Sequence, residues 1–318
     1  IVNASTVLHL NQTASEYAYH LVQQTAKDDV IRQMRKRYNA PAEQVRKDFE
    51  DLVDRLHVLV DTPDLDPITF LDFERSDPYS GEITAPYRLD CALTYRVADA
   101  EAGEAAPLDR VDRELSSDEW KVILDKAWDA GIPHIIFTGG EPTLRSDLAD
   151  LITHAEHLGQ VSGVLTNGLR LAEKDYLQQL LQSGLDHLMV IFDTNEEQAW
   201  EALRDVMAED IFATVHLTIT KIDTEEIVGA LQRMKELGVE SLSLSAMDAD
   251  LNSTLQEIRE AAADMQFSLV WDVPVPYSSF NPVSLEMSGE GEKVRGAGKA
   301  WLYVEPDGDV LEAQGKPK

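Results

Sequence analysis

Short apolar segments alternate six times with longer amphipathic segments between residues 87 and 266, and this alternation limits the fold more than any other feature of the chain. Short segments such as HIIFTGG (134–140) have the length and β-branched content of buried strands. Four of the long segments are followed by glycine, where a helix C-terminus favours a left-handed residue: Gly131, Gly159, Gly184 and Gly238. Six strand–helix units with short connections predict a parallel α/β sheet covered by helices.

The first sixty residues predict a separate, small helical domain. A short strand over 5–10 precedes three helices, and Asn11 or Thr13 can cap the first of them. The third helix, over 42–59, carries apolar residues at the spacing of a buried stripe, namely Val45, Phe49, Leu52, Val53 and Leu56. One strand followed by three short helices is typical of a winged helix.

Two further segments complete the domain organisation. Residues 61–86 are rich in Asp and Pro, lack helical periodicity and are predicted to be a linker. After a Gly-rich, charged stretch, AWLYVEPDGDVLEA (300–313) predicts a hairpin around a Pro-Asp-Gly turn. We therefore expect four regions: a winged helix over 1–60, a linker over 61–86, an α/β domain over 87–285 and a hairpin region over 286–318.

Charge and composition exclude several classes of protein. The chain has 28 Lys and Arg against 58 Asp and Glu, a net charge of −30. Residues 1–60 hold eight basic and eight acidic residues and are neutral, so the remaining 20 basic and 50 acidic residues carry the entire net charge. Such a body repels nucleic acid and could attract a basic peptide, although solubility or adaptation to salt is the commoner reason. No apolar run is long enough to span a membrane. A single cysteine excludes an internal disulfide and favours a cytoplasmic location. Because the sequence starts at Ile1, we expect that N-terminal residues are missing.

The predicted strand ends carry the candidate site, because parallel α/β folds keep their functional residues there. The most specific segment is TGGEP (138–142), in which two glycines expose the backbone, a carboxylate follows and proline restricts it. This set suits a ligand with both an ammonium and a carboxylate, such as an amino acid; taken alone, a tight turn with a helix-capping glutamate is the alternative. We find no nucleophile–base–acid triad and no Walker or Rossmann fingerprint, so no catalytic residue is assigned.

The order of a strand, a loop, GGEP, TNG (166–168) and FD (192–193) resembles the radical S-adenosylmethionine (SAM) superfamily over about residues 87–285. The resemblance implies a partial (β/α)6 barrel of TIM type, with a CxxxCxxC loop after the first strand whose three thiolates hold a 4Fe–4S cluster. It also implies that SAM binds to the fourth iron and to the strand ends. The cofactor-binding residues would be Gly139, Gly140, Glu141, Pro142, Thr166, Asn167, Gly168 and Asp193.

The same resemblance shows that the cluster cysteines are missing. Aligning LTYR (93–96) with the family's first strand places the cysteine positions at Val97, Glu101 and Glu104. Valine cannot ligate iron, and carboxylates are hard donors where such clusters need thiolates. The hairpin is similar to the start of the SPASM or twitch extension, whose auxiliary-cluster cysteine corresponds here to Ala313. Cys91 is expected to be a buried strand residue. We therefore predict SAM binding without a 4Fe–4S cluster and without any other metal.

Residues 6–60 are similar to PqqD-like domains, which recognise ribosomally synthesised peptides. The shared features are LN-TA at the first helix, Tyr38 closing the second, and V–DF–L–L in the third. The resemblance implies that a leader peptide adds as a β-strand beside the strand and the third helix. The peptide-binding residues would be Thr6, Val7, Leu8, Val45 and Phe49.

Three functional interpretations follow. We favour a protein of ribosomal peptide maturation that captures a precursor peptide as a cluster-less pseudoenzyme or scaffold, with an active radical SAM enzyme as a candidate partner. The second is a radical SAM/SPASM peptide-modifying enzyme whose cysteines were replaced. The third is a winged-helix regulator with a ligand-sensing barrel, which the acidic charge makes unfavourable on DNA.

Three histidines leave one alternative about metals. His134, His187 and His216 lie on different predicted strands and share parity with strand-end residues, so all three could point into a barrel. A metal site is one interpretation; core histidines with hydrogen-bond partners are commoner, and we predict the latter.

Overall fold

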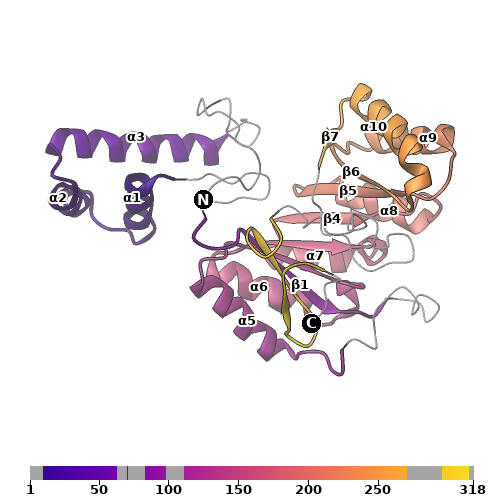
Figure 1. Cartoon of the computed structure of the whole chain (residues 1–318), viewed down its shortest axis with the longest axis horizontal. Coiled ribbons are helices and arrows are strands. Elements are labelled where there is room, and N and C mark those ends of the chain that lie inside the picture. Colours follow the sequence, from indigo (N-terminus) through magenta and orange to yellow (C-terminus); the bar gives the residue numbers. More distant parts are fainter. Residues whose placement is uncertain (1–9, 63–69, 71–82, 98–110, 271–295, 315–318) are drawn as a thin grey trace. The chain divides into compact units, whose positions relative to one another are not determined.

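The computed structural model describes residues 10–62, 70, 83–97, 111–270 and 296–314 (Figure 1). The chain divides into two compact units, Ile1–Ser80 and Gly81–Lys318. Among the described residues, no helix has both the length and the apolar character needed to cross a membrane.

In the first unit, residues 10–62 form the helices α1 (Gln12–Val22), α2 (Lys27–Tyr38) and α3 (Ala42–Asp61). Asn11 caps α1, since its side chain accepts a hydrogen bond from the Ala14 N–H at 2.9 Å. The core of this unit consists of Tyr17, Val30, Ile31, Met34, Val45 and Phe49. The three predicted helices are present, whereas the strand expected over 5–10 lies, apart from Leu10, outside the described residues.

The second unit is built on one sheet with the order β7-β6-β5-β4-β3-β2-β1-β8-β9. Its strands are β1 (Arg88–Thr94), β2 (His134–Gly139), β3 (Val161–Thr166), β4 (His187–Ile191), β5 (Phe212–Ile219), β6 (Ser241–Ala246), β7 (Ser268–Leu269), β8 (Trp301–Val304) and β9 (Val310–Leu311). Neighbouring strands are parallel throughout, except that β9 is antiparallel to β8. The predicted parallel α/β sheet is confirmed, and its edges are β7 and β9, so the described strands form an open, partial barrel.

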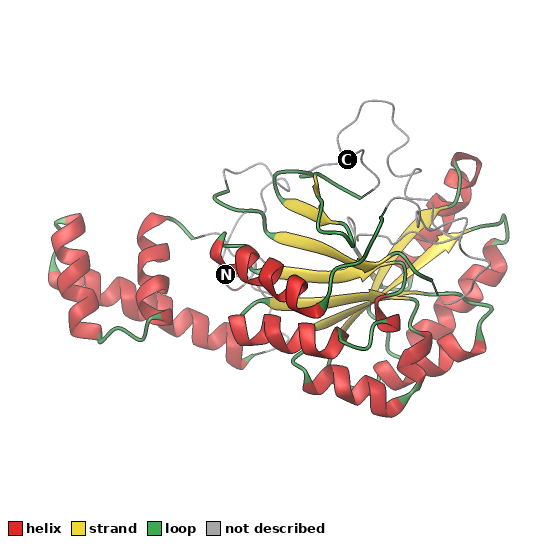
Figure 2. Ribbon diagram, turned by 90° about the horizontal axis from the view of Figure 1, so that it is seen from below, coloured by secondary structure: helices red, strands yellow, loops and turns green. Residues whose placement is uncertain are grey.

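A helix follows each of the first six strands, and the helices cover one face of the sheet (Figure 2). They are α5 (Ser117–Asp129), α6 (Leu148–Leu158), α7 (Lys174–Gln182), α8 (Glu197–Val206), α9 (Thr224–Glu236) and α10 (Asn252–Asp264), with short 3-10 helices η3 (Pro142–Leu144), η4 (Leu169–Ala172) and η5 (Ala249–Leu251). The four glycines expected at helix C-termini all have φ between +83° and +92°. The predicted caps are thus confirmed.

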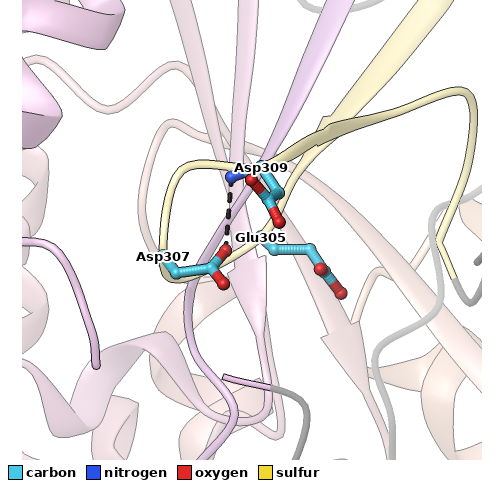
Figure 3. A group of neighbouring side chains, drawn as sticks. All are labelled: Glu305, Asp307 and Asp309. Atoms are coloured by element: carbon cyan, nitrogen blue, oxygen red, sulfur yellow. Dashed lines mark hydrogen bonds between the residues drawn. The ribbon is translucent and has the colours of Figure 1, made fainter. Parts of the chain in front are cut away.

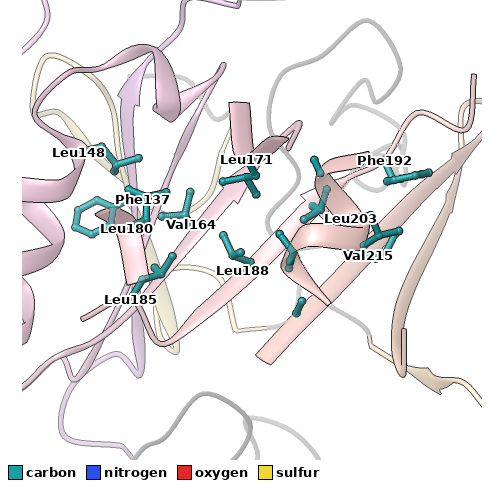
Figure 4. Close-up of a cluster of buried hydrophobic side chains, with 14 of the residues drawn as sticks. Phe137, Leu148, Val164, Leu171, Leu180, Leu185, Leu188, Phe192, Leu203 and Val215 are labelled. Atoms are coloured by element: carbon teal, nitrogen blue, oxygen red, sulfur yellow. The ribbon is translucent and has the colours of Figure 1, made fainter. Parts of the chain in front are cut away.

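The large core lies between the sheet and these helices. Alternate strand residues such as Phe137, Val164, Leu188 and Val215 point toward the helices and pack in one cluster (Figure 4). The opposite, inner face of the sheet has a small apolar cluster of Ile136, Leu165 and Met189. Because strand residues alternate, the other inner positions are free to carry polar groups.

The hairpin predicted over 300–313 forms from β8 and β9, and it does more than turn the chain. β8 pairs with β1 in parallel, with Arg88 opposite Trp301 and Cys91 opposite Val304. The first strand of the barrel is therefore bordered on both sides, by β2 and by β8, an arrangement that the sequence pattern did not indicate.

Candidate functional site at the carboxyl ends of β1, β2 and β3

Two glycines bring the ends of β1 and β2 into direct backbone contact. Gly140 N–H donates to Thr94 O at 2.7 Å, and Glu141 N–H donates to Arg96 O at 2.8 Å. A Cβ atom added to Gly139 or Gly140 would overlap the carbonyl oxygen of Thr94 or Arg96 respectively, and Gly139 also has φ +128°. Glycine is required at both positions because the residues that follow β1 run against the motif.

Glu141 is buried, with 3% of its surface exposed, and its carboxylate joins two loops. Oε1 accepts from Thr143 N at 3.0 Å, Thr143 Oγ1 at 2.5 Å and Thr166 Oγ1 at 2.7 Å. Oε2 accepts from Asn167 N at 2.7 Å. Burial raises the pKa of Glu141, and these four hydrogen bonds oppose the rise. The carboxylate therefore bonds to the chain itself.

The TNG turn after β3 is held by the same carboxylate. Thr166 Oγ1 also accepts from Gly168 N at 3.1 Å, and Asn167 Oδ1 accepts from Leu169 N at 3.0 Å. Gly168 has φ +78°, and a Cβ there would come within 2.8 Å of Val190. The structure therefore brings seven predicted cofactor-binding residues, 139–142 and 166–168, into one connected set of loops.

Asp193 stands in the next loop, after β4, and stabilises that loop. Its Oδ1 accepts from the Asn195 backbone N–H at 2.9 Å and from the Asn195 side chain at 3.2 Å. The hydrogen bonds of the described residues join Asp193 to its own loop and not to the GGEP and TNG loops. Its place at the end of a neighbouring strand is as expected, and its contact with a ligand stays a prediction.

A polar network beside β1 was not found by sequence reasoning. The Arg145 guanidinium donates to Leu93 O at 3.2 Å and Leu115 O at 3.0 Å, and it pairs with Asp147 through two hydrogen bonds. Burial acts to raise the pKa of Asp147, but hydrogen bonds from Arg145 and Ser117 outweigh it and hold the pKa below its usual value. Arg145 thus binds the chain at two described points, Leu93 at the end of β1 and Leu115 just before α5.

Glu114 lies in the same network and faces the end of β1. Thr94 Oγ1 donates to Glu114, and Arg96 Nη2 lies 3.4 Å from its other oxygen. The sequence around Arg145 and around Glu114 gives no local sign of these contacts. Their partners at the end of β1, Leu93 and Thr94, lie about fifty and twenty residues away in the chain. The signal that could have found them is the unusual position of charged groups next to strand ends.

At the predicted cluster positions, the side chains that the structure describes do not fit an iron–sulfur cluster. Val97 is half-buried, Ala313 is buried, and both carry hydrocarbon side chains; positions 101 and 104 lie outside the described residues. Cys91 is fully buried and packs in the core on the helix-covered face, and burial raises its pKa well above the ordinary thiol value. A thiol held neutral on the helix-covered face cannot serve as a cluster ligand.

The three histidines point to the inner face of the sheet, as their parity predicted. His134 Nε2 and His187 Nε2 are 2.7 Å apart, across Gly163 of the strand between them. His216 contacts Ser243 Oγ at 2.9 Å through Nδ1 and Ser245 Oγ at 3.1 Å through Nε2. Burial is the largest cause that lowers their pKa values, to about 2 for His134 and about 4 for the other two. All three have hydrogen-bond partners in the chain, which supports the prediction of core histidines.

Three acidic groups gather at the hairpin turn (Figure 3). Oxygen atoms of Glu305, Asp307 and Asp309 lie within 4.8 Å of one another, and Asp307 Oδ1 accepts from Asp309 N at 3.2 Å. Glu305 is buried, and its Oε1 accepts from Tyr95 Oη at 2.9 Å. This contact ties the hairpin to the residue that follows β1.

In the first unit, the predicted peptide-binding residues fall into two groups. Val45 and Phe49 are 2% and 7% exposed, and the Phe49 ring packs against Tyr17 with ring centroids 5.7 Å apart. They therefore support α3 from the inside. Thr6, Val7 and Leu8 lie outside the described residues.

An open barrel of parallel βα units, with glycine-rich loops at the carboxyl ends of its first strands, places the second unit in the class of TIM-type α/β proteins. The model of the radical SAM superfamily matches residues 91–265, more than half of the chain, and the chain belongs to this superfamily. The model of coenzyme PQQ synthesis protein D (PqqD) matches residues 1–58. The predicted resemblances to the radical SAM superfamily and to PqqD-like domains are thus confirmed.

Individual relatives agree with this assignment. The chain is 38% identical over 90 residues to a PqqA peptide cyclase of Bradyrhizobium diazoefficiens, a match that covers 28% of this chain and 23% of that protein. The matched stretch is therefore less than a quarter of that relative's length. Streptococcus suis SuiB has a similar fold. Its crystal structure with the precursor peptide SuiA matches with a TM-score of 0.58 and 14% identity, over 98% of this chain and 79% of that chain. Its crystal structure with S-adenosylmethionine matches with a TM-score of 0.59 and 15% identity, over 98% of this chain and 78% of that chain.

Proposed function

We propose that this protein takes part in the maturation of a ribosomally synthesised peptide in the cytoplasm. Residues 1–60 bind the leader segment of the precursor, and the barrel binds S-adenosylmethionine without a 4Fe–4S cluster. The protein then acts as a pseudoenzyme or scaffold, beside an active radical SAM partner enzyme. The observation that carries the proposal is the presence of a PqqD region and a radical SAM region in one chain that lacks the cluster thiols.

The leader peptide would add as a β-strand to residues 6–8, next to α3. Val45 and Phe49 pack α3 against α1 and α2 and so fix the position of the helix beside which the peptide is proposed to lie. Strand addition depends on backbone hydrogen bonds, which tolerate different leader sequences. Two of the basic residues of α2 are paired with acids, Arg32 with Asp29 and Arg37 with Glu16 at 3.0 Å, which reduces the positive charge they offer to nucleic acid.

S-adenosylmethionine would lie at the carboxyl ends of β1–β3, with its amino acid part at the GGEP loop. The Glu141 carboxylate already accepts hydrogen bonds from Thr143, Thr166 and Asn167, so the ammonium group is proposed to bind to the backbone of the motif. Asp193, in the following loop, completes the proposed site. Bound in this way the cofactor is a ligand, and no reductive cleavage is assigned to it.

Anaerobic reconstitution with iron and sulfide, followed by metal and sulfide analysis, tests the cluster-less state. We expect no stoichiometric cluster in the protein as it stands. A variant with Val97→Cys, Glu101→Cys and Glu104→Cys restores the three positions and is expected to gain cluster absorbance, because the loop entry at Thr94–Arg96 is already held against GGEP. A full cluster in the unaltered protein would show that the enzyme interpretation is correct.

Peptide capture needs its own test. Where a short open reading frame lies beside the gene, it would supply the candidate peptide, and the labelled synthetic leader of that peptide can be titrated by fluorescence anisotropy. We expect binding that Val7→Pro abolishes, since proline lacks the N–H that a paired strand donates. Binding of a DNA duplex with a steep salt dependence, and none of the leader, would instead favour the regulator.

A further inference from the structure

Residues 94–96, at the carboxyl end of β1, are bonded to the rest of the second unit from two sides. On one side, the backbone carbonyl groups of the first and last of these residues accept from the N–H groups of Gly140 and Glu141. On the other side, the Tyr95 hydroxyl donates to Glu305 Oε1 at 2.9 Å, and Glu305 begins the turn between β8 and β9. The middle residue therefore connects the end of β1 with the C-terminal hairpin.

The contact between Tyr95 and Glu305 lies in the interior. Tyr95 is 2% exposed and Glu305 is 0% exposed. Tyr303, on β8, donates from its own hydroxyl to the Tyr95 hydroxyl at 3.3 Å. The two tyrosines also pack with Ala92 and Leu311 in one cluster of buried residues. Packing and hydrogen bonds thus hold the Tyr95 side chain in one place, and a buried polar group whose bond is broken pays the full cost of desolvation.

The same turn holds a second part of the chain, just before α5. The Leu115 N–H donates to Pro306 O at 2.7 Å, and a Cβ atom on Gly308 would lie only 3.2 Å from the Leu115 side chain. Two backbone hydrogen bonds of 2.8 Å close the turn itself, from the Glu305 N–H to Asp309 O and from the Gly308 N–H to Glu305 O. One closed turn therefore binds the chain both after β1 and before α5.

We propose that Glu305 is a positioning residue for the candidate site: through Tyr95 it fixes the end of β1 against which the loop after β2 is bonded. The proposal rests on the proposed function for the identity of the ligand, and it adds the C-terminal hairpin to the elements that determine ligand affinity. Linkage between two sites acts in both directions. A ligand at the strand ends should therefore stabilise the hairpin turn, although it does not touch that turn.

Amide hydrogen exchange of the full chain tests the first direction. Tyr95→Phe removes the hydroxyl and keeps the ring, and Glu305→Gln replaces the carboxylate by a weaker acceptor of the same size. Each variant is expected to raise exchange in 139–141 by about tenfold, the effect of losing one buried hydrogen bond. Because both changes act on the same bond, the double variant should exchange no faster than the faster single variant.

Ligand binding tests the second direction, which a contact of purely structural importance would not affect. S-adenosylhomocysteine is the probe, and its binding to the unaltered protein is expected to slow exchange at Leu115 and Gly308. In Tyr95→Phe with the probe bound at saturation, this slowing should be absent. Equal slowing in both proteins, or none in the unaltered protein, would overturn the proposal.

The matched control removes another bond between a tyrosine and a glutamate. Tyr38→Phe deletes the hydroxyl that donates to Glu16 at 2.7 Å in the first unit, and it should leave exchange in 139–141 unchanged. Unaltered exchange in 139–141 in Tyr95→Phe and Glu305→Gln contradicts the positioning role, and so does an equal rise throughout β4 and β5, which indicates general destabilisation. If the unaltered protein does not bind the probe, the proposed cofactor site fails, and the exchange rates in 139–141 alone decide on the role of Glu305.

Discussion

Gly163 is the point where the inner face of the sheet is most sensitive to a single methyl group. The glycine lies on β3 between His134 of β2 and His187 of β4, and the His187 ring passes directly over it. A Cβ atom at this position would overlap the ring, with Nδ1 only 2.8 Å away and two other ring atoms closer still. Gly163→Ala must therefore displace a buried ring.

The expected cost has two parts. Overpacking of a filled interior costs about 1–3 kcal/mol, and separating the two imidazoles loses about 1 kcal/mol more. We expect Gly163→Ala to lower the free energy of unfolding by about 2–4 kcal/mol, measured by urea denaturation followed by circular dichroism. For a domain of this size the melting temperature should fall by about 2–4 °C per kcal/mol.

Two variants make this reasoning refutable. Gly229→Ala, in the exposed interior of α9 with no atom within 4 Å of the new Cβ, should stabilise the protein by about 0.5–1 kcal/mol. Gly163→Ala combined with His187→Ala should be less destabilised than the sum of the single changes, because the overlap disappears. If Gly163→Ala behaves like Gly229→Ala, the packing of the two histidines is wrong.

Two more expectations concern buried titratable groups. His216 takes up a proton near pH 6.5 in the unfolded chain, its ordinary pKa, and only near pH 4 in the folded chain. From this residue alone, the free energy of unfolding should therefore fall by about 2 kcal/mol between pH 7 and pH 5. Urea denaturation of His216→Gln at both pH values should show a smaller fall, and an equal fall would contradict the assignment. Cys91 is fully buried with a raised pKa, so Ellman's reagent should react with no thiol in the native protein and with one in urea. Rapid labelling of the native protein would show that β1 becomes exposed.

The sequence pattern was sufficient for elements whose signals are local. Helix caps at Asn11 and Gly159, the alternation of strands and helices and the turn of the last hairpin all depend on residues close together in the chain. The sequence also predicted that TGGEP and TNG lie close together, because both follow parallel strands and the carboxyl ends of parallel strands meet at one edge of the sheet.

Contacts between distant segments could not be read in this way. The bond from Thr166 to Glu141 joins residues 25 positions apart, and it converts an expected ligand group into an internal acceptor. Arg145 reaches Leu93 across 52 positions for the same reason. The core position of Phe49 was visible as part of a stripe, but the stripe does not tell which residues of the first unit pack against it.

The parallel pairing of β8 with β1 has a consequence for how the chain is made. Arg88 meets Trp301, so the free side of β1 is closed only after more than two hundred further residues have left the ribosome. Until then the growing protein displays an uncovered strand edge, the feature most prone to pairing with other chains. Synthesis that stops shortly before Trp301 should therefore leave a barrel with all six strand–helix units and a strong tendency to aggregate.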